Sequence, residues 1–298
     1  MKNNIIRWVC MSVSIVGAAF LAACSENAES QYKDAKSTPM TFVVKHPSQT
    51  RATETDFEIG DRIGLYVADT EKPMELGGNL ANNDALTYDG DKWTSLRPLY
   101  WDDGTFNVYA IYPRMDKITS LDSQPFSVAL DQNTPKTATS LGGYEASDLL
   151  FASQKSVTAS DSPVSLLFHH IMSKLRIRLI KGEDFEGELP TNAKVYIHST
   201  FTSATVDLRQ GIVTYNPRVA RQSIIAHQDD KTSYSAIVVP QNITTSMPFL
   251  EVVVNGVSYF YESRFNYKPG VENLVNLIIS KDPEQVKIEI GGEIKDWQ

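Results

Sequence analysis

The chain has 298 residues, of which 42% are hydrophobic, and this content is ample for a folded core. Its formal net charge at pH 7 is −8. An acidic chain lacks the basic surface that phosphate groups need, so the charge balance argues against nucleic acid as a partner.

The first predicted element is an export signal at residues 1–23. Lys2 and Arg7 give it a positively charged start, and an apolar stretch follows from about Trp8 to Phe20. That stretch is shorter than the roughly 20 residues that a membrane-spanning helix needs. An ordinary secretory signal and an N-terminal membrane helix are the alternatives.

The signal ends in Leu21-Ala22-Ala23-Cys24, which resembles the lipobox of bacterial lipoproteins. The resemblance implies cleavage between Ala23 and Cys24 and a lipid on the Cys24 thiol, which would anchor the mature chain in the outer membrane. Since Cys10 would leave with the signal, the folded part would contain no disulfide. The loss of 23 residues and two positive charges would leave 275 residues with a net charge of −10.

A tether and a first strand follow the lipobox. Residues 24–39 are polar and lack periodicity, which is typical of a flexible tether. Thr41, Phe42, Val43 and Val44 form the first strand-like run. The polar stretch after it contains Arg51 and indicates an exposed loop.

Short strand signals then recur along the rest of the chain, and no long amphipathic helix is indicated. Asn255-Gly256 joins two of these runs and is a strong signal for a type I′ hairpin. The expected strands include 63–67, Trp93, 100–101, 106–112, 164–170, 175–179, 195–197, 206–208, 212–215, 235–239, 250–254, 257–261, 274–279 and 286–290.

Many short strands separated by turns favour an all-β fold made of two β-sandwiches in tandem. The length is also a prior for roughly two domains. We expect an N-terminal sandwich at residues 40–162 and a C-terminal one at 163–298, with the boundary in the polar stretch Thr158–Pro163. The strand that starts at Val164 fits either domain.

Motifs for catalysis or cofactor binding are not indicated, so we expect neither an enzyme nor a cofactor. His169 and His170 are adjacent, and neighbours in a strand point to opposite faces, so they cannot both ligate one metal ion from a strand. A packed or hydrogen-bonded role is the better interpretation. The folded part lacks a cysteine nucleophile and a Gly-x-Ser-x-Gly elbow.

Two acidic groups could bind calcium, but their spacing does not match an EF-hand, and turns explain them more simply. The first group is Asp84, Asp89 and Asp91, and the second is Asp102-Asp103. We expect no metal at either.

Several segments together resemble the fimbrillins, the lipoprotein-derived subunits of type V pili. Each segment is a weak signal, but they occur in the family's order. The resemblance implies two transthyretin-like β-sandwich domains, which agrees with the strand pattern. The segments are Thr50-Arg51-Ala52, Phe57–Tyr66, Phe106–Pro113, Asp148–Ala152 and Leu166–Leu175.

The same resemblance implies assembly by strand exchange. A protease would cut between Arg51 and Ala52 and release the strand Thr41–Val44, and a neighbouring subunit would fill the vacated groove. The donor would be the C-terminal stretch, in which Val286, Ile288 and Ile290 share one face, continued by Ile294. Alternatively, Arg51 is an ordinary loop residue, and the C-terminal stretch is the last strand of its own domain.

The sequence therefore predicts a fimbrial subunit at the cell surface, in a stalk role or a tip or accessory role. Its expected partners are other pilin subunits, the outer membrane through Cys24, and a host or bacterial receptor. The alternative is a permanently anchored lipoprotein that binds glycan or protein ligands. Trp93, Tyr100 and Trp101 are candidate ligand-binding rings, although core packing explains them more simply.

Overall fold

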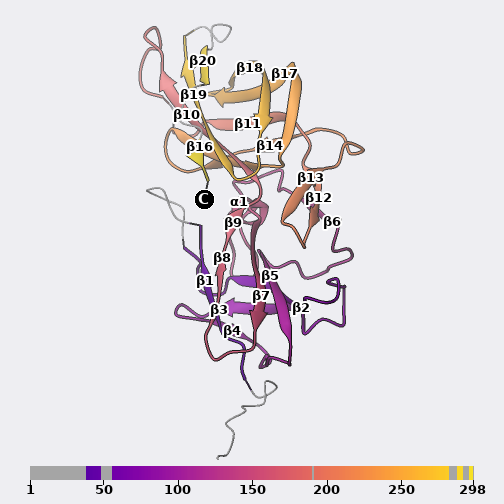
Figure 1. Cartoon of the computed structure of the whole chain (residues 1–298). Helices are drawn as coiled ribbons and strands as arrows, with labels where there is room; N and C mark the ends of the chain where they lie inside the picture. The colour runs from indigo at the N-terminus through magenta and orange to yellow at the C-terminus, as the bar shows by residue number, and fades with distance from the viewer. Residues whose placement is uncertain (1–37, 48–55, 190, 282–286, 291–294, 298) are drawn as a thin grey trace, which may run out of the picture. The chain divides into compact units, whose positions relative to one another are not determined.

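The structure is a computed structural model, and it describes residues 38–47, 56–189, 191–281, 287–290 and 295–297. These residues are almost entirely β-structure, which confirms the expected all-β class (Figure 1). Among the residues described, no helix is long and apolar enough to cross a membrane.

The N-terminal sheet has the strand order β4-β3-β2-β5-β7-β9, and each neighbouring pair in it is antiparallel. A separate pair consists of β1 and β8, which run parallel. The bounds are β1 Phe42–Lys45, β2 Arg62–Asp69, β3 Ala81–Tyr88, β4 Trp93–Ser95, β5 Thr105–Tyr112, β7 Leu150–Thr158, β8 Val164–Leu167 and β9 His169–His170. The short helix α1, Gly143–Ser147, precedes β7.

The C-terminal sheet has the order β15-β16-β10-β19-β20, and β21 also pairs with β19. A second sheet has the order β14-β11-β17-β18, and a third has the order β13-β12-β6. The bounds are β6 Gln124–Ser127, β10 Ser173–Lys181, β11 Lys194–Thr200, β12 Ser203–Asp207, β13 Ile212–Tyr215, β14 Gln222–Ile225, β15 His227–Gln228, β16 Ser233–Val238, β17 Gln241–Val254, β18 Val257–Tyr267, β19 Val271–Ile279, β20 Lys287–Ile290 and β21 Lys295–Asp296.

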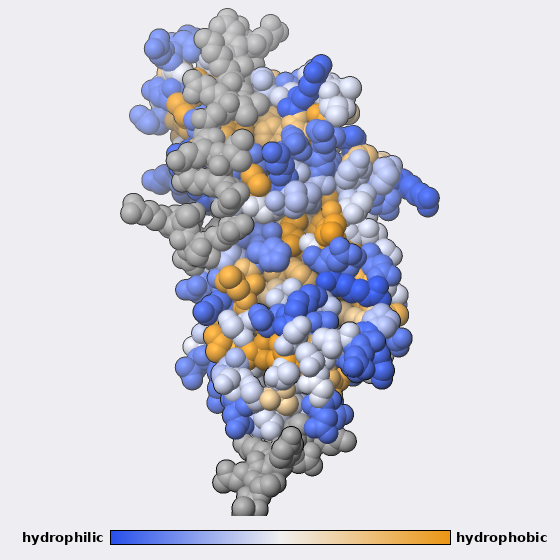
Figure 2. Space-filling model, viewed as in Figure 1, coloured by the Kyte–Doolittle hydropathy of each residue, from blue (hydrophilic) through white to orange (hydrophobic). Residues whose placement is uncertain are grey.

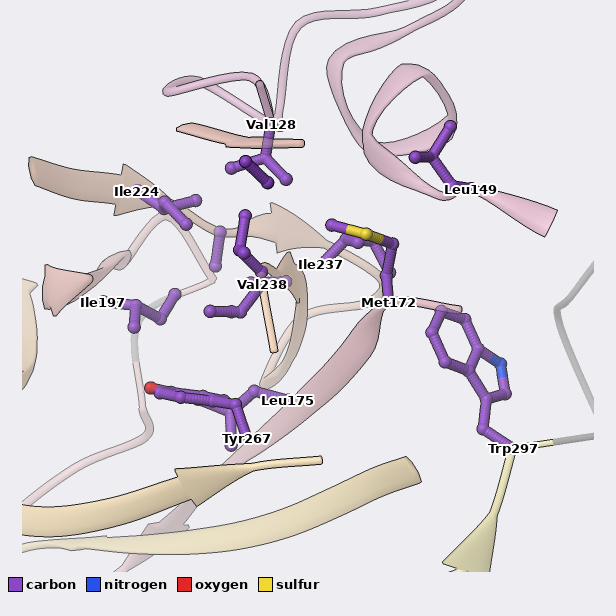
Figure 3. Close-up of a cluster of buried hydrophobic side chains, with 14 of the residues drawn as sticks. Val128, Leu149, Met172, Leu175, Ile197, Ile224, Ile237, Val238, Tyr267 and Trp297 are labelled. Atoms are coloured by element: carbon purple, nitrogen blue, oxygen red, sulfur yellow. The ribbon is translucent and has the colours of Figure 1, made fainter. Parts of the chain in front are cut away.

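In the N-terminal sheet, β2 and most of β5 are buried on both faces, and side chains that alternate along each strand enter two different cores. In β2, Ile63, Leu65 and Val67 point into one core, whereas Tyr66 and Ala68 point into another. We call the first the N-terminal core; it also contains Met40, Trp101, Phe106, Val108, Leu150, Val164, Leu166 and Phe168. The second, the C-terminal core, contains Met172, Leu175, Ile197, Ile224, Ile237, Val238, Tyr267 and Trp297 (Figure 3).

Pairing links the segments on either side of the expected domain boundary. β8 and β9 follow residue 162 but pair with β1 and β7, and β6 precedes it but pairs with β12. The division into domains at 162 and 163 therefore stays a prediction, and residues 164–170 pair with strands of the N-terminal half.

Most expected strands are present. The hairpin at Asn255-Gly256 is confirmed, since both residues have positive φ, 50° and 80°, as a type I′ turn requires. One expectation is wrong: Tyr100 makes only an isolated bridge to Pro39, and Trp101 lies outside the strands that the structure describes. Trp101 is instead buried in the N-terminal core.

A buried side chain replaces a backbone strand partner at one place. The Gln132 amide donates to the Ile237 carbonyl at 2.7 Å, and its oxygen accepts from the Ile237 N–H at 2.8 Å. Gln132 is fully buried, so these two bonds cannot be exchanged for bonds to water. This loop residue thereby completes the hydrogen bonding of β16.

Hydrophobic residues also reach the surface, as patches between hydrophilic residues on the viewed face (Figure 2). The described exposed ones include Val43, Leu96, Leu167 and Phe260. Scattered residues of this kind are normal on a folded protein and need no functional explanation.

Leu65 is buried in β2 whereas Leu96 is exposed, so shortening the two side chains should change the stability of the fold by different amounts. Leu65→Ala removes side-chain volume from the N-terminal core and should lower the free energy of unfolding by about 2–5 kcal/mol. Leu96→Ala, at a fully exposed position, should change it by less than about 0.5 kcal/mol. Urea unfolding measures both, and equal effects would contradict this assignment of the core.

Gln132→Leu should cost at least about 2 kcal/mol, because it leaves the Ile237 N–H and carbonyl without partners in a buried place. Gln154→Leu on the exposed side of β7 is the matched control and should be close to neutral. A Gln132 variant as stable as the control would show that water reaches β16.

Candidate assembly interface

The β1 strand is attached to the rest of the chain by few backbone hydrogen bonds. Among the described residues, its strand partner is β8 alone, with Phe42 opposite Val164 and Lys45 opposite Leu167. The pair is parallel, an arrangement slightly less stable per residue than an antiparallel one. In Figure 1, β1 runs beside β8 although the two are far apart in the sequence.

Both ends of β1 are fixed by further backbone bonds. The Val164 N–H donates to the Thr41 carbonyl at 2.9 Å, and the Phe168 N–H donates to the Lys45 carbonyl at 3.0 Å. Just before the strand, the Met40 N–H donates to the Leu99 carbonyl at 2.8 Å. The strand thus lies along the edge of β8 with its inward side chains over the N-terminal core, and we call the place it occupies there the β1 groove.

Side chains of β1 alternate between the groove and the surface. Met40 is buried in the N-terminal core, and Phe42 and Val44 pack against it. Val43 between them is 44% exposed. Three apolar side chains therefore anchor the strand, and an incoming strand would need apolar side chains at the same alternate positions.

An aromatic cluster lies where β1 ends. The His46 ring contacts Phe57 edge to face, with centroids 5.0 Å apart. Phe57 in turn makes edge contacts with Trp93, Tyr112 and Phe168, with centroids 4.9–5.8 Å apart. Burial lowers the pKa of His46, although its hydrogen bond to the Pro47 carbonyl opposes the shift.

His170 connects this cluster to the C-terminal end of the chain. Its ring lies edge to face with His46, with centroids 6.0 Å apart, and stacks on the Trp297 indole, with centroids 3.5 Å apart and an interplanar angle of 12°. Its Nδ1 is hydrogen-bonded to Asp148 Oδ1 at 2.9 Å. His170 is buried and His169 exposed, so the two rings do lie on opposite faces as expected.

A polar cavity of about 280 Å³ opens beside His46 and His170. Its lining includes Asp61, Tyr112, Tyr144, Lys174 and Arg176. Burial raises the pKa of the Tyr112 hydroxyl, and the nearby Asp61 carboxylate adds to the shift.

Lys174 is a buried charge on the wall of this cavity. Its Nζ lies 3.2 Å from Glu272 Oε2, and the Arg176 guanidinium forms an ion pair with the same oxygen at 3.2 Å. Burial lowers the pKa of the Lys174 ammonium to about 8, and Glu272 opposes the shift. The same Nζ lies 5.3 Å from the centre of the Trp297 ring, within reach of a cation–π contact.

Several residues singled out from the sequence lie outside the described residues, and the structure does not test them. These are Ala23, Cys24, Arg51, Ala52, Val286 and Ile294. Ile288 and Ile290 lie in β20, which pairs antiparallel with β19 of its own sheet. The roles expected for these residues stay predictions.

The acidic groups take part in turns and ion pairs. Both oxygens of Asp84 accept from the Arg97 guanidinium at 2.8 Å, and Asp89 accepts the N–H groups of Asp91 and Lys92. Within the described ranges, no group of His, Cys, Asp and Glu residues is arranged to hold a metal ion.

The candidate ligand-binding rings have different environments. Trp101 is buried, and Trp93 packs against Phe57 and Tyr88. Tyr100 is 47% exposed. Core packing, the simpler explanation, is therefore confirmed for Trp101.

Sequence reasoning missed the residues that connect β1 to the C-terminal end. None of His46, Phe57 and Trp297 is among the candidate site residues predicted from the sequence. His46 and Phe57 lie on either side of the loop that contains Arg51, and this placement alone is only a weak sequence signal for a site. The contact with Trp297 depends on β21, whose pairing with β19 cannot be derived from local pattern.

The all-β fold agrees with comparisons to known proteins. A family profile described as fimbrillin-like matches residues 50–297. The chain belongs to the fimbrillin-like family. Membership points to a structural, non-enzymatic protein of the pilus type at the cell surface.

Solved structures share the fold of this fimbrillin-like protein. A proposed cell adhesion protein of Bacteroides ovatus is 20% identical, with a TM-score of 0.68, over 88% of this chain and 98% of that one. One from Bacteroides uniformis is 22% identical, with a TM-score of 0.67, over 88% and 99%. A Bacteroides ovatus fimbrial protein is 16% identical, with a TM-score of 0.52, over 80% and 48%. No curated protein matches the chain.

The alternation along β1 predicts how strongly two neighbouring residues hold the strand. Phe42→Ala removes an anchor from the groove and should speed hydrogen exchange of the β8 amides that donate to β1 by about tenfold or more. Val43→Ala, on the exposed side, should leave that exchange near the wild-type rate. Exchange followed by mass spectrometry measures both.

Equal protection of β8 in the two variants would contradict the groove described above. A loss of protection in both would mean that β1 is held by its backbone and not by its inward side chains.

Proposed function

We propose that this fimbrillin-like protein is a pilus subunit that assembles by exchange of β1. Cleavage after Arg51 would separate β1 from the rest of the chain, and a strand from a neighbouring subunit would take its place on β8. This mode of recognition is β-strand addition, in which backbone hydrogen bonds give affinity and side-chain pockets give specificity.

The observation that carries the proposal is the way β1 is held. It has one described strand partner, it is parallel to that partner, and it fills an apolar groove with alternate side chains. Its departure would leave the β8 edge and the N-terminal core open to water. An unpaired edge of this kind favours the binding of another strand.

The proposed donor is the C-terminal stretch that includes β20. Ile288 and Ile290 stand at alternate positions of a strand, the spacing that a groove-filling strand needs. β20 is the last strand in the order of the C-terminal sheet, next to β19 alone in that order. A donor strand must separate from β19 before it can pair with β8 of a neighbouring subunit.

Export as a lipoprotein belongs to the same proposal. A lipid on Cys24 would hold the precursor at the outer membrane, and cleavage after Arg51 would separate the folded part from that anchor. A stalk subunit needs both a groove and a donor, whereas a tip subunit needs only the groove. In either role, the subunit would offer the place of β1 to a donor strand.

The alternative, a permanently anchored glycan-binding lipoprotein, has less support. Its candidate rings do not form one exposed surface, because Trp101 is buried and Trp93 packs against Phe57.

The test is cleavage of the full chain by an arginine-specific protease. We expect a new N-terminus at Ala52 and conversion of the monomer into multimers large enough to sediment. Arg51→Lys keeps the charge but removes the cleavage point, so this variant should stay monomeric under the same conditions.

A chain that is cut after Arg51, loses β1 and still remains monomeric at high concentration would overturn strand exchange. A chain that resists cleavage at Arg51 while other arginines are cut would overturn the proposed maturation.

A further inference from the structure

The two ends of the described chain meet on one side chain. His46 lies one residue beyond β1 and Trp297 lies one residue beyond β21, and both rings contact the buried ring of His170. We call these three residues the His170 clasp. The proposed exchange of β1 does not require any structural change at Trp297 when β1 leaves. The contacts of the clasp therefore have a different role from the exchange itself.

Trp297 is held by the packing of its indole, by a backbone hydrogen bond and by the short strand β21. The indole is almost fully buried at the margin of the C-terminal core, beside Met172 (Figure 3). Its backbone N–H donates to the Gly270 carbonyl at 2.8 Å, and the pairing of β21 with Val271 and Glu272 is only two residues long. The close stack on His170 is one of the contacts that hold this end of the chain.

The position of His170 depends in turn on its own neighbours. The Asp148 carboxylate fixes its Nδ1, and the ring of His46 closes its edge. His46 is held from its other side by Phe57, which follows the Arg51 loop and would stay with the subunit after cleavage. Removal of the segment through Arg51 would take His46 from between Phe57 and His170.

We infer that the His170 clasp couples the N-terminal segment to the C-terminal end: while His46 is in place, His170 is held against Trp297, and loss of His46 loosens Trp297 and β21 from β19. The use of this coupling in assembly rests on the proposed function, because there it would delay release of the tail until β1 has left. The coupling itself does not depend on assembly.

Hydrogen exchange in the full chain tests the coupling without cleavage. His46→Ala should raise the exchange rate of the C-terminal peptide containing Trp297 by roughly 2- to 10-fold, the worth of one aromatic contact. His170→Ala should raise it at least as much. His46→Phe keeps an aromatic edge against His170 and should restore a rate close to that of the wild type.

Two comparisons separate the coupling from general destabilisation. His198→Ala is the matched control, because His198 also stacks on an aromatic ring, Tyr196, but lies outside the clasp. It should leave the C-terminal peptide unchanged. A peptide covering β2, buried in both cores, reports global unfolding and should exchange at the same rate in the wild type and in His46→Ala.

The double variant shows whether His46 acts through His170. Since the ring contacts between described residues connect His46 to Trp297 through His170, the variant with both histidines changed to alanine should exchange no faster than His170→Ala alone. Additive effects would overturn the coupling. The coupling would also be overturned if the C-terminal peptide exchanged at the wild-type rate in His46→Ala but faster in His170→Ala.

Cleavage after Arg51 distinguishes this inference from the proposed function. A cleaved chain with a faster-exchanging C-terminal peptide that fails to form multimers would contradict strand exchange and leave the coupling intact. A cleaved chain that forms multimers while the tail of His46→Ala stays as protected as wild type would support strand exchange and overturn the coupling.

Discussion

An apolar groove in a β-fold must be filled by a strand, and this constraint governs the structure. β8 and the N-terminal core present that groove, and β1 fills it from far away in the sequence. The arrangement satisfies the backbone of β8 and covers the core with only three inward side chains. Because β8 is the one described strand that pairs with β1, the place of β1 can be vacated without breaking the pairing of the six-stranded N-terminal sheet.

The N-terminal sheet supplies the rigid support for that groove. Its strands β2 and β5 are buried on both faces, so these two cannot shift in register without moving apolar side chains out of one core or the other. The aromatic residues at the end of β1 rest on this sheet through Phe57 and Tyr112. His170, on its last strand β9, then brings the C-terminal end into contact with the same cluster.

Strong alternation made many strands predictable. Leu175–Leu179 and the Asn255-Gly256 hairpin could be placed because local pattern and turn chemistry specify them. β3 could not, because Asn82, Asn83 and Asp84 interrupt its apolar pattern. The structure accommodates them with an irregular register between β2 and β3 and a positive φ of 53° at Asn83. These are tertiary choices that local propensity does not record.

The site was less predictable than the fold, because its contacts join residues distant in sequence. Alternation along β10 places Lys174, Arg176 and Arg178 on one face, but it does not indicate that Lys174 is only 1% exposed. Its burial is possible because Glu272 stands opposite it in the parallel pair of β10 and β19. The Trp297 stack on His170 likewise required knowledge of β21 and β9 together.

The central claim is that β1 is a strand to be replaced, and the N-terminal residue of the assembled protein on native cells tests it most directly. Mass spectrometry of surface fibres should find chains that begin at Ala52. Assembled chains that begin at a lipidated Cys24 and still carry Thr41–Val44 would contradict the account, because their grooves would already be filled.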